Sequence, residues 1–502
     1  MLMNAEAYRD SLRALAPRVF VNGRRIDCVA DEPLLAPGVA AVGVAYDLAA
    51  GEPAMMTART PDGRLVNRML HIDTSPDDLL VKLEAVRALC RIAGCAQRYL
   101  AHDSLNALHQ ATTRADGEGR SDYGQRFAAW LELAQSRDLA IGVAMTDGKG
   151  DRSLRPGAQV NRDVYVHVKE RRRDGLVIAG VKAIVTGAPY MHELLVMPCR
   201  THTPDDRDFA ICCAVPVDAP GVTLVARPAG RPGEAAATFS ARYGQSTAIV
   251  HFDDVFVPHE RVFIDGETDA AGFLTTSYAT HHRHSCIAAR AGFGDLLIGA
   301  GVLMTEANGL DFERHDHIRD AMVDLIATVE GFYACGVAAS VYAQRDPAGS
   351  FMPEPVFANV GKLLLATKIY DMHRLAHTVS GGLIVALPGP DEDHNPETAA
   401  AMADAFAGRA DIPPERRRDI ARLIEDVTAS HQGAWYSVIS LHGGGSPEAM
   451  KREIWRNYPV AEKSELVRRL VERGAVDDGR PVSNQPGRCC AAGCSASDKA
   501  AE

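Results

Sequence analysis

The stretch DVYVHVKERRRDGLVIAGVKAIVTG, residues 163–187, decides the fold class. Apolar and polar residues alternate along it on both sides of the turn-forming sequence RRRDG. This period of two is typical of β-strands that bury one face, and further short strands follow, separated by Gly, Pro and Asp. They are LLVMPCR, FAICCAVPV, GVTLVARP and STAIVHFDDVFVP. The sequence therefore predicts a central antiparallel β-domain, a β-barrel, over residues 140–269.

The segments on both sides of this β-domain follow a helical period. Residues 1–139 form a predicted N-terminal helical domain, with helices near 76–111 and 123–136, and Ser75 is a natural N-cap for the first. Residues 270–474 contain long helical segments that predict a C-terminal helical bundle. These segments lie near 285–307, 313–345, 355–379, 413–432 and 448–473.

Helix, sheet and helix in this order predict an α+β fold that is acyl-CoA dehydrogenase-like, although a pattern gives a fold class and not a chemistry. The tail, residues 475–502, is rich in Gly, Pro and Ser and is expected to be mobile. Its three cysteines make a weak metal site without a fourth ligand, so a redox-sensitive tail is the better interpretation. They are Cys489, Cys490 and Cys494.

Composition excludes several classes of partner. The chain has 502 residues and a formal net charge of −11, which argues against nucleic acid and anionic membranes, because both attract a basic face. No run of 18 apolar residues is present and the N-terminus lacks an apolar signal core, so we expect no membrane span and a cytoplasmic protein. The eleven cysteines are then expected to stay reduced.

Seven local sequences are informative in combination. They are CAQRYLAHDSLNAL (95–108), MTDGKGDRSLRP (145–156), TGAPYMHELLVMP (186–198), FDDVFVPHERVF (252–263), GFGDLLIGA (292–300), SGGLIVALP (380–388) and HGGGSP (442–447). Together they resemble the 4-hydroxyphenylacetate 3-hydroxylase / 4-hydroxybutyryl-CoA dehydratase flavoprotein family, and they look closest to the dehydratase branch. The resemblance implies an FAD enzyme, usually a homotetramer, with the flavin between the β-domain and the helices.

The chain departs from the dehydratase branch at its iron–sulfur ligands. The resemblance implies a [4Fe–4S] cluster held by three cysteines and one histidine. Cys95 and His282 fill two of these positions, whereas Tyr99 and Ala289 stand at the other two. Alanine cannot bind iron, and tyrosine is a poor substitute for a thiolate. We therefore predict no metal at this site.

Other cysteines offer a rearranged ligand set. Cys286 lies four residues after His282, on the same helix face. Cys90 lies five residues before Cys95, about 140° round the helix. A cluster held by Cys90, Cys95, His282 and Cys286 is therefore awkward, but the sequence leaves it open.

Loss of the cluster ligands favours the chemistry of the hydroxylase branch. There, reduced FAD and oxygen hydroxylate a phenol, and a separate flavin reductase supplies the reduced flavin. The resemblance thus implies a two-component, FAD-dependent monooxygenase acting on a phenolic or otherwise activated small molecule. The alternative is a 4-hydroxybutyryl-CoA dehydratase/vinylacetyl-CoA isomerase-like enzyme acting on an acyl-CoA. A third hypothesis is a non-catalytic relative that serves as a partner subunit.

The predicted catalytic residues lie at the former ligand positions. His282, freed of iron, is expected to act as a general base, and Tyr99 to orient a substrate oxygen. The alternatives are a buried polar histidine and an aromatic ring that fills the space of the cluster. Cys286 is expected to pack rather than react, and Arg283 and His284 are interpreted as solvated helix residues.

The predicted cofactor contacts lie in three loops or strand ends. The glycines of MTDGKGDR let backbone N–H groups approach a flavin, and Lys149 and Arg152 add positive charge; the alternative is an ordinary Asp-Gly turn. Ser446 precedes a helix and is expected to cap it or to help hold a phosphate, although HGGGSP also suits a simple helix connector. The full set is Thr146, Lys149, Arg152, Thr186, Gly444 and Ser446.

Overall fold

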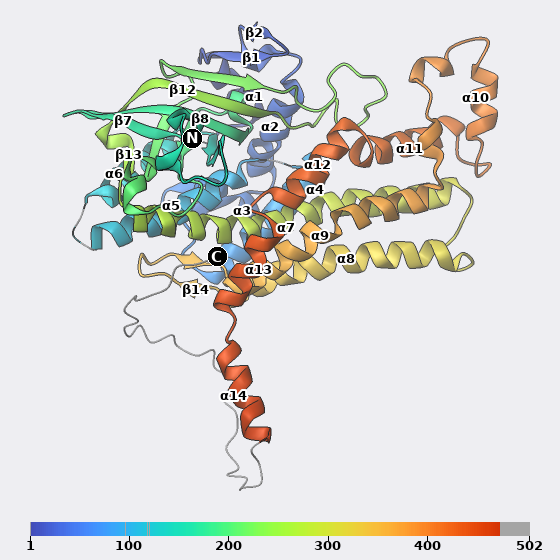
Figure 1. The fold of residues 1–502 in the computed structure, drawn as a ribbon. Coiled ribbons are helices and arrows are strands. Elements are labelled where there is room, and N and C mark those ends of the chain that lie inside the picture. Colours follow the sequence, from blue (N-terminus) through green and yellow to red (C-terminus); the bar gives the residue numbers. More distant parts are fainter. Residues whose placement is uncertain (1, 96, 118, 120, 472–502) are drawn as a thin grey trace. The chain divides into compact units, whose positions relative to one another are not determined.

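Most strands of two β-sheets lie along the chain between a first group of helices and a second group (Figure 1). The computed structural model describes residues 2–95, 97–117, 119 and 121–471. The first helices are α1 (Ala5–Arg13), α2 (Ala36–Gly51), α3 (Pro53–Met56), α4 (Pro76–Ala93), α5 (Tyr99–Gly117) and α6 (Tyr123–Ser136). The later helices are α7 (Thr268–Ala307), α8 (Asp316–Val341), α9 (Pro355–Ser380), α10 (Ala399–Phe406), α11 (Pro414–Thr428), α12 (His431–His442), α13 (Pro447–Asn457) and α14 (Val460–Val471). The fold is mixed α+β, as predicted.

The chain divides into two units, which are described separately. The first unit is Met1–Asn457, and the second begins at Tyr458 and includes α14. The predicted tail with its three cysteines, residues 475–502, lies outside the described residues. The boundaries after residues 139, 269 and 474 stay predictions.

Residues 167–186, from the stretch of alternating apolar and polar residues, form a hairpin within a seven-stranded sheet. This sheet has the order β2-β1-β11-β12-β8-β6, and β7 also pairs with β8. Its strands are β1 (Val19–Val21), β2 (Arg24–Ile26), β6 (Thr146–Asp147), β7 (His167–Arg171), β8 (Gly175–Thr186), β11 (Val222–Ala226) and β12 (Thr247–Pro258). The RRRDG turn joins β7 to β8, with the N–H of Arg172 donating to the carbonyl of Gly175 at 2.8 Å.

A second sheet has four strands, in the order β13-β10-β9-β5. They are β5 (Ile141–Ala144), β9 (Glu193–Val196), β10 (Ile211–Pro216) and β13 (Val262–Asp265). Two short hairpins complete the strands: β3 (Thr57–Arg59) with β4 (Leu65–Asn67), and β14 (Gln344–Arg345) with β15 (Phe351–Met352). The pairs β1·β11 and β5·β9 are parallel, so the sheets are not purely antiparallel.

The predicted closed barrel is wrong. Within the described residues, the larger sheet path ends at β2 and β6 and the smaller at β13 and β5, so neither closes on itself. Alternating apolar residues show only that one face of a strand is buried, which holds for an open sheet as well as for a barrel. The pattern therefore identified the strands but not whether the sheet closes.

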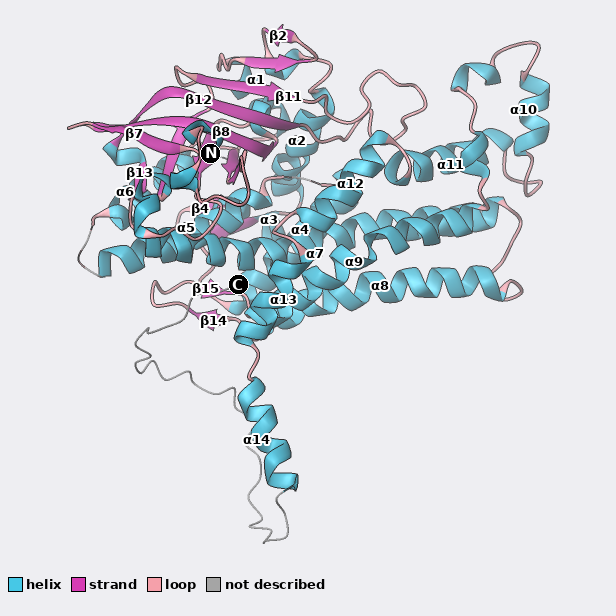
Figure 2. Cartoon of the chain, viewed as in Figure 1, coloured by secondary structure: helices cyan, strands magenta, loops and turns pink. Residues whose placement is uncertain are grey.

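The long helix α7 is the centre of the helical part. It packs against α4, α5, α8 and α9, and Figure 2 shows α7, α8 and α9 running alongside one another. Sequence periodicity placed its start near residue 285, but the helix begins at Thr268. By length and composition alone α7 and α8 are apolar enough to cross a membrane, yet most of the apolar part of α7 is buried in the protein core.

Three predicted helices are interrupted where the backbone requires it. The helix expected over 76–111 ends at Gly94, which has φ +68°, a conformation that favours glycine. The helix expected over 448–473 is interrupted at Pro459, which lacks the N–H that a helix interior needs. The segment 413–432 contains the whole of α11 and the start of α12, with Ser430 as the N-cap of α12.

Glycine in α7 allows a close approach of two helices. A Cβ at Gly292 would overlap the backbone carbonyl oxygen of Arg87 in α4. Backbone atoms of a packed helix cannot move aside as a flexible side chain does. The contact between α4 and α7 therefore depends on the missing side chain at this position.

We expect Gly292→Ala to lower the free energy of unfolding by about 1–3 kcal/mol, because the added methyl group forces α4 and α7 apart. Gly299→Ala is the matched control on the same helix, since a Cβ there meets no atom within 4 Å. It should instead stabilise by about 0.5–1 kcal/mol through helix propensity. Denaturant unfolding of both variants tests this, and equal stabilities would contradict the close packing.

Candidate functional site

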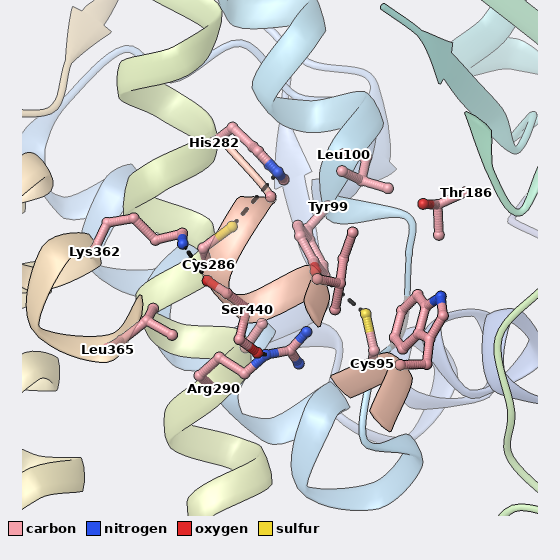
Figure 3. Close-up of a pocket in the computed structure, with 14 residues that line it drawn as sticks. Cys95, Tyr99, Leu100, Thr186, His282, Cys286, Arg290, Lys362, Leu365 and Ser440 are labelled. Atoms are coloured by element: carbon pink, nitrogen blue, oxygen red, sulfur yellow. Dashed lines mark hydrogen bonds between the residues drawn. The ribbon is translucent and has the colours of Figure 1, made fainter. Parts of the chain in front are cut away.

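A pocket lies where α5, α7, α9 and α12 meet the end of β8 (Figure 3). Apolar side chains such as Leu365 and Trp435 form part of its wall. The remainder is polar and titratable, which is unusual for a surface so deep in the protein. The polar lining residues that matter below are Cys95, Tyr99, His282, Cys286, Arg290 and Lys362.

All four positions of the expected iron–sulfur ligands line this pocket. Cys95, Tyr99, His282 and Ala289 are brought together from α5, α7 and the turn before α5. The Cys95 sulfur and the Tyr99 hydroxyl lie 3.3 Å apart, so the phenol ring stands beside the retained thiol. A methyl group and a phenol at two positions do not fit a cluster that takes thiolates there.

The rearranged ligand set is not assembled either. Cys90 is buried in the core and is not among the residues that line the pocket. Across the part of the chain that the structure describes, no group of three or more His, Cys, Asp or Glu side chains is placed to hold a metal ion. The residues present therefore do not fit the cluster.

The His282 ring lies between a carboxylate and a thiol and contacts both. Its Nδ1 lies 3.1 Å from Oδ2 of Asp103, and its Nε2 lies 3.5 Å from the sulfur of Cys286. The spacing of four residues along α7 places His282 and Cys286 on one face, one turn apart. The imidazole also stacks against the ring of Tyr278, with centroids 5.3 Å apart, and against Tyr99 at 6.2 Å.

Burial and the charges of neighbouring side chains shift the pKa values of the titratable residues in the pocket. Burial favours the neutral imidazole, but Cys286 and Asp103 outweigh it and raise the pKa of His282 to about 9. Burial likewise favours the neutral thiol, yet the neighbouring His282 lowers the pKa of Cys286 below its usual value. Burial raises the pKa of both Cys95 and Tyr99. The geometry therefore favours a thiolate on Cys286 next to an imidazolium.

Asp103 is held by a buried polar cluster behind the pocket. The Ser285 hydroxyl donates to Oδ1 of Asp103 at 2.6 Å, and Nζ of Lys82 lies 3.5 Å from the same oxygen. All three side chains are buried. Burial opposes ionisation of Asp103, but Lys82 and the two neighbouring histidines hold the pKa of its carboxyl well below the usual range. The cluster fixes the carboxylate that orients His282.

Two cations face the pocket from different helices. Nε of Arg290 donates to the Ser440 hydroxyl at 2.5 Å, and Nζ of Lys362 donates to the Ser440 carbonyl at 2.6 Å. Burial lowers the pKa of Lys362 to about 8. Among the described residues, Nη1 of Arg290 is buried without a hydrogen-bond partner. Both cations are therefore available to an anionic group in the pocket.

The predicted cofactor contacts are only partly brought together. Thr186 lines the pocket at the end of β8. Thr146 lies in β6 opposite Ile184 of β8, so it belongs to the same edge of the sheet. Lys149 and Arg152 are exposed on the loop that follows β6.

The HGGGSP loop lies beside the pocket. A Cβ at Gly444 would lie 3.4 Å from Cδ2 of His282, and the Gly444 carbonyl accepts from Nε of Arg283 at 2.9 Å. Ser446 accepts from the N–H of Ala449 at 3.4 Å, at the start of α13. The assignment of these residues to cofactor binding stays a prediction. Arg283, interpreted as solvated, is instead buried.

Several polar side chains in or behind the pocket escaped the sequence analysis. Asp103 lies in the segment CAQRYLAHDSLNAL, whose mixture of polar and apolar residues does not mark it as a buried charge. Cys286 was assigned to packing, although its spacing from His282 was recognised. Nothing in the sequence pattern marked Arg290 and Lys362 as pocket residues, because each is one of several charged residues within a long helix.

Known proteins match the chain over nearly its whole length. Models of the N-terminal and C-terminal parts of 4-hydroxyphenylacetate 3-hydroxylase match residues 4–264 and 271–472. The chain is 32% identical over 490 residues to the 4-hydroxybutyryl-CoA dehydratase/vinylacetyl-CoA-Delta-isomerase of Clostridium aminobutyricum, which covers 94% of this chain and 99% of that protein.

Solved structures agree with this match. An oxygen-tolerant archaeal 4-hydroxybutyryl-CoA dehydratase from N. maritimus has a TM-score of 0.91 at 32% identity, over 97% of this chain and 98% of that one. The oxygenase component of 4-hydroxyphenylacetate 3-monooxygenase, complexed with FAD, has a TM-score of 0.84 at 20% identity, over 94% and 98%. The second likeness supports the fold alone.

We expect Asp103→Asn to lower the free energy of unfolding by about 3–5 kcal/mol, because it leaves Lys82 buried without its counter-charge. The matched control is Asp371→Asn, whose carboxylate pairs with Lys368 on the surface and should cost less than about 1 kcal/mol. Denaturant unfolding at neutral pH measures both. Similar small losses for the two variants would show that the buried pair does not hold the helices.

Proposed function

The chain belongs to the 4-hydroxyphenylacetate 3-hydroxylase family, and we propose that it is the oxygenase component of a two-component, FAD-dependent monooxygenase. The proposed substrate is a phenol or a similarly activated small molecule. One observation carries the proposal: two of the positions expected to bind iron hold Tyr99 and Ala289, in a pocket that also holds a base and two cations. Such a site suits flavin chemistry without a metal.

FAD would supply the activation of oxygen when bound. The residues present fit this group, because the sheet edge with Thr186 faces the pocket and the loop after β6 exposes the cations Lys149 and Arg152. A diphosphate takes such cations as partners. The oxygenase of similar fold is complexed with FAD, which supports the same cofactor here.

The chain's own residues would prepare the substrate. The pair of His282 and Cys286 would act as the base, because a thiolate beside an imidazolium can take up the proton of a phenol at its sulfur. Arg290 and Lys362 would hold the resulting phenolate, and the Tyr99 hydroxyl would orient it by a hydrogen bond. Asp103 would keep the His282 ring in position through Nδ1.

We expect the protein, given photoreduced FAD, air and 4-hydroxyphenylacetate as a probe, to consume oxygen in step with hydroxylated product. His282→Asn should lower kcat by about 10²–10⁴-fold, the usual worth of a general base. His317→Asn, at an exposed position of α8, is the control and should leave kcat unchanged. An oxygen electrode and chromatography measure the two quantities, and product formed at the same rate without oxygen would contradict the proposal.

A second candidate is an acyl-CoA dehydratase or double-bond isomerase, which the 32% identity to the Clostridium aminobutyricum enzyme favours. Isomerisation needs a base that moves a proton along the acyl chain, and His282 with Cys286 would be that base. Anaerobic conversion of vinylacetyl-CoA by the purified protein would support this candidate. Iron and sulfide assays that find about four of each per chain would favour the complete dehydratase reaction.

The proposal includes a homotetramer and a separate flavin reductase as partners. Helix α8 leaves large apolar side chains exposed, and most of its apolar length is not buried within this chain. Exposed apolar surface of this extent marks an interface more often than free surface. The side chains are Val323, Ile326, Val337 and Val341.

We expect a molar mass in solution of about four times 53.9 kDa by light scattering. The double variant Ile326→Glu/Val337→Glu should yield smaller species, because charges on an apolar contact surface cannot be paired there. Asp324→Asn, an exposed position of the same helix, should leave the mass unchanged. A wild-type monomer would contradict the assembly without bearing on the chemistry of the pocket.

A further inference from the structure

Cys286, His282 and Asp103 contact one another in series, with the Cys286 thiol at the end that faces the pocket. Its sulfur lies 3.5 Å from Nε2 of His282, and Nδ1 of the same ring lies 3.1 Å from Asp103. Nucleophile, base and orienting carboxylate in this order are the arrangement that activates cysteine and serine in enzymes of unrelated folds. The flavin chemistry proposed above uses this pair only for proton transfer, so it leaves the nucleophilic capacity of the thiol unexplained.

The surroundings of Cys286 differ from those of the other pocket thiol. Cys286 is partly exposed and lines the pocket, whereas Cys95 is buried, which raises its pKa. His282, Arg290 and Lys362 all act to lower the pKa of Cys286. A thiolate with cations around it and access to a pocket is the reactive form of cysteine.

A second observation points to a ligand beside this thiol. Arg290 is 4% exposed, lines the same pocket, and its Nη1 has no hydrogen-bond partner within the described residues. A buried guanidinium with a free N–H is costly unless something in the pocket accepts from it. The acceptor that fits is an oxygen that carries negative charge, at rest or during a reaction.

We propose that Cys286 adds covalently to the β-carbon of an α,β-unsaturated carbonyl compound in this pocket. The sulfur–carbon bond forms as the carbon–carbon double bond breaks, and its electron pair moves to the carbonyl oxygen as an enolate. Arg290 stabilises that oxygen. The His282 imidazolium then gives its proton to the α-carbon, which leaves a thioether on Cys286 and a neutral imidazole. No electrons are gained or lost, and reversal regenerates both partners.

The pocket suits this substrate class in its apolar wall as well. Leu100, Leu365 and Ile439 line it beside the polar groups, so a carbonyl compound with a short hydrocarbon part would contact both. Conjugate addition requires a thiolate, a proton donor and a cation for the enolate, and all three line one cavity. It needs neither FAD nor oxygen, so its test is independent of the oxygenase proposal.

The full-length protein is treated at neutral pH with 2-cyclohexenone, an unsaturated ketone, and separately with iodoacetamide, which alkylates thiolates without forming an enolate. Peptide mass spectrometry gives the rate of modification at each cysteine. We expect Cys286 to react at least about tenfold faster than Cys335 with both reagents, because it has more thiolate. Cys335, partly exposed in α8, has a pKa raised by burial and serves as the internal reference.

Two variants separate the roles of the neighbours. His282→Gln should slow modification of Cys286 by both reagents about tenfold or more, because the thiolate loses its imidazolium. Arg290→Gln should slow the ketone reaction much more than the iodoacetamide reaction, since only the ketone forms an enolate. Cys335→Ser is the control and should leave the rates at Cys286 unchanged.

Two outcomes of these measurements would overturn the proposal. Equal rates at Cys286 and Cys335 in the wild-type protein would show that the thiol is not activated, and this comparison needs no variant to fold. Equal slowing of both reagents in Arg290→Gln would remove the assigned role of the guanidinium in conjugate addition.

Discussion

Asp103 is a carboxylate without exposed surface, and the arrangement of three helices follows from the partners that such a group requires. Burying an ionised carboxylate costs several kcal/mol unless cations and hydrogen-bond donors surround it. Lys82 comes from α4, and Ser285 and His282 come from α7, while Asp103 itself lies in α5. A shift of any one helix would leave a buried charge without its partner. The constraint that stabilises the fold therefore also places the reactive side chains.

Two glycines make this arrangement possible. Gly292 lets α7 approach α4 closely enough for their side chains to share the buried cluster. Gly94 ends α4 at φ +68°, so the chain turns before α5 and presents Cys95 and Tyr99 to α7. A Cβ at Gly94 would also overlap the Tyr436 hydroxyl. The pocket thus depends on positions where a side chain is excluded as much as on those that line it.

The sequence contained most of the secondary structure but less of the site. The period of two around RRRDG identified β7 and β8, because that signal is local, whereas the edges of the sheet depend on partners far along the chain, such as β1 with β11. His282 and Tyr99 were singled out because they stand at positions where the resemblance implies iron–sulfur ligands. Asp103 was not, because its importance comes from Lys82, which reaches it from another helix. Periodicity reports which face is buried, not which charges meet there.

The spacing of residues along α7 distinguishes this pocket from the iron–sulfur ligand set that the resemblance implies. The resemblance places the cluster's histidine and cysteine seven residues apart, which is about 10 Å along a helix, a gap that a bridging group between them can span. The pair His282 and Cys286 is only four residues apart, about 6 Å along the axis, and the two side chains contact each other directly. A thiol that contacts an imidazole at this distance can exchange a proton with it directly. With Ala289 at the distant position, α7 has the histidine of the ligand set that the resemblance implies and lacks its cysteine. The helix face to which the resemblance assigns iron ligands instead carries a contacting imidazole and thiol, groups that suit acid–base and nucleophilic chemistry.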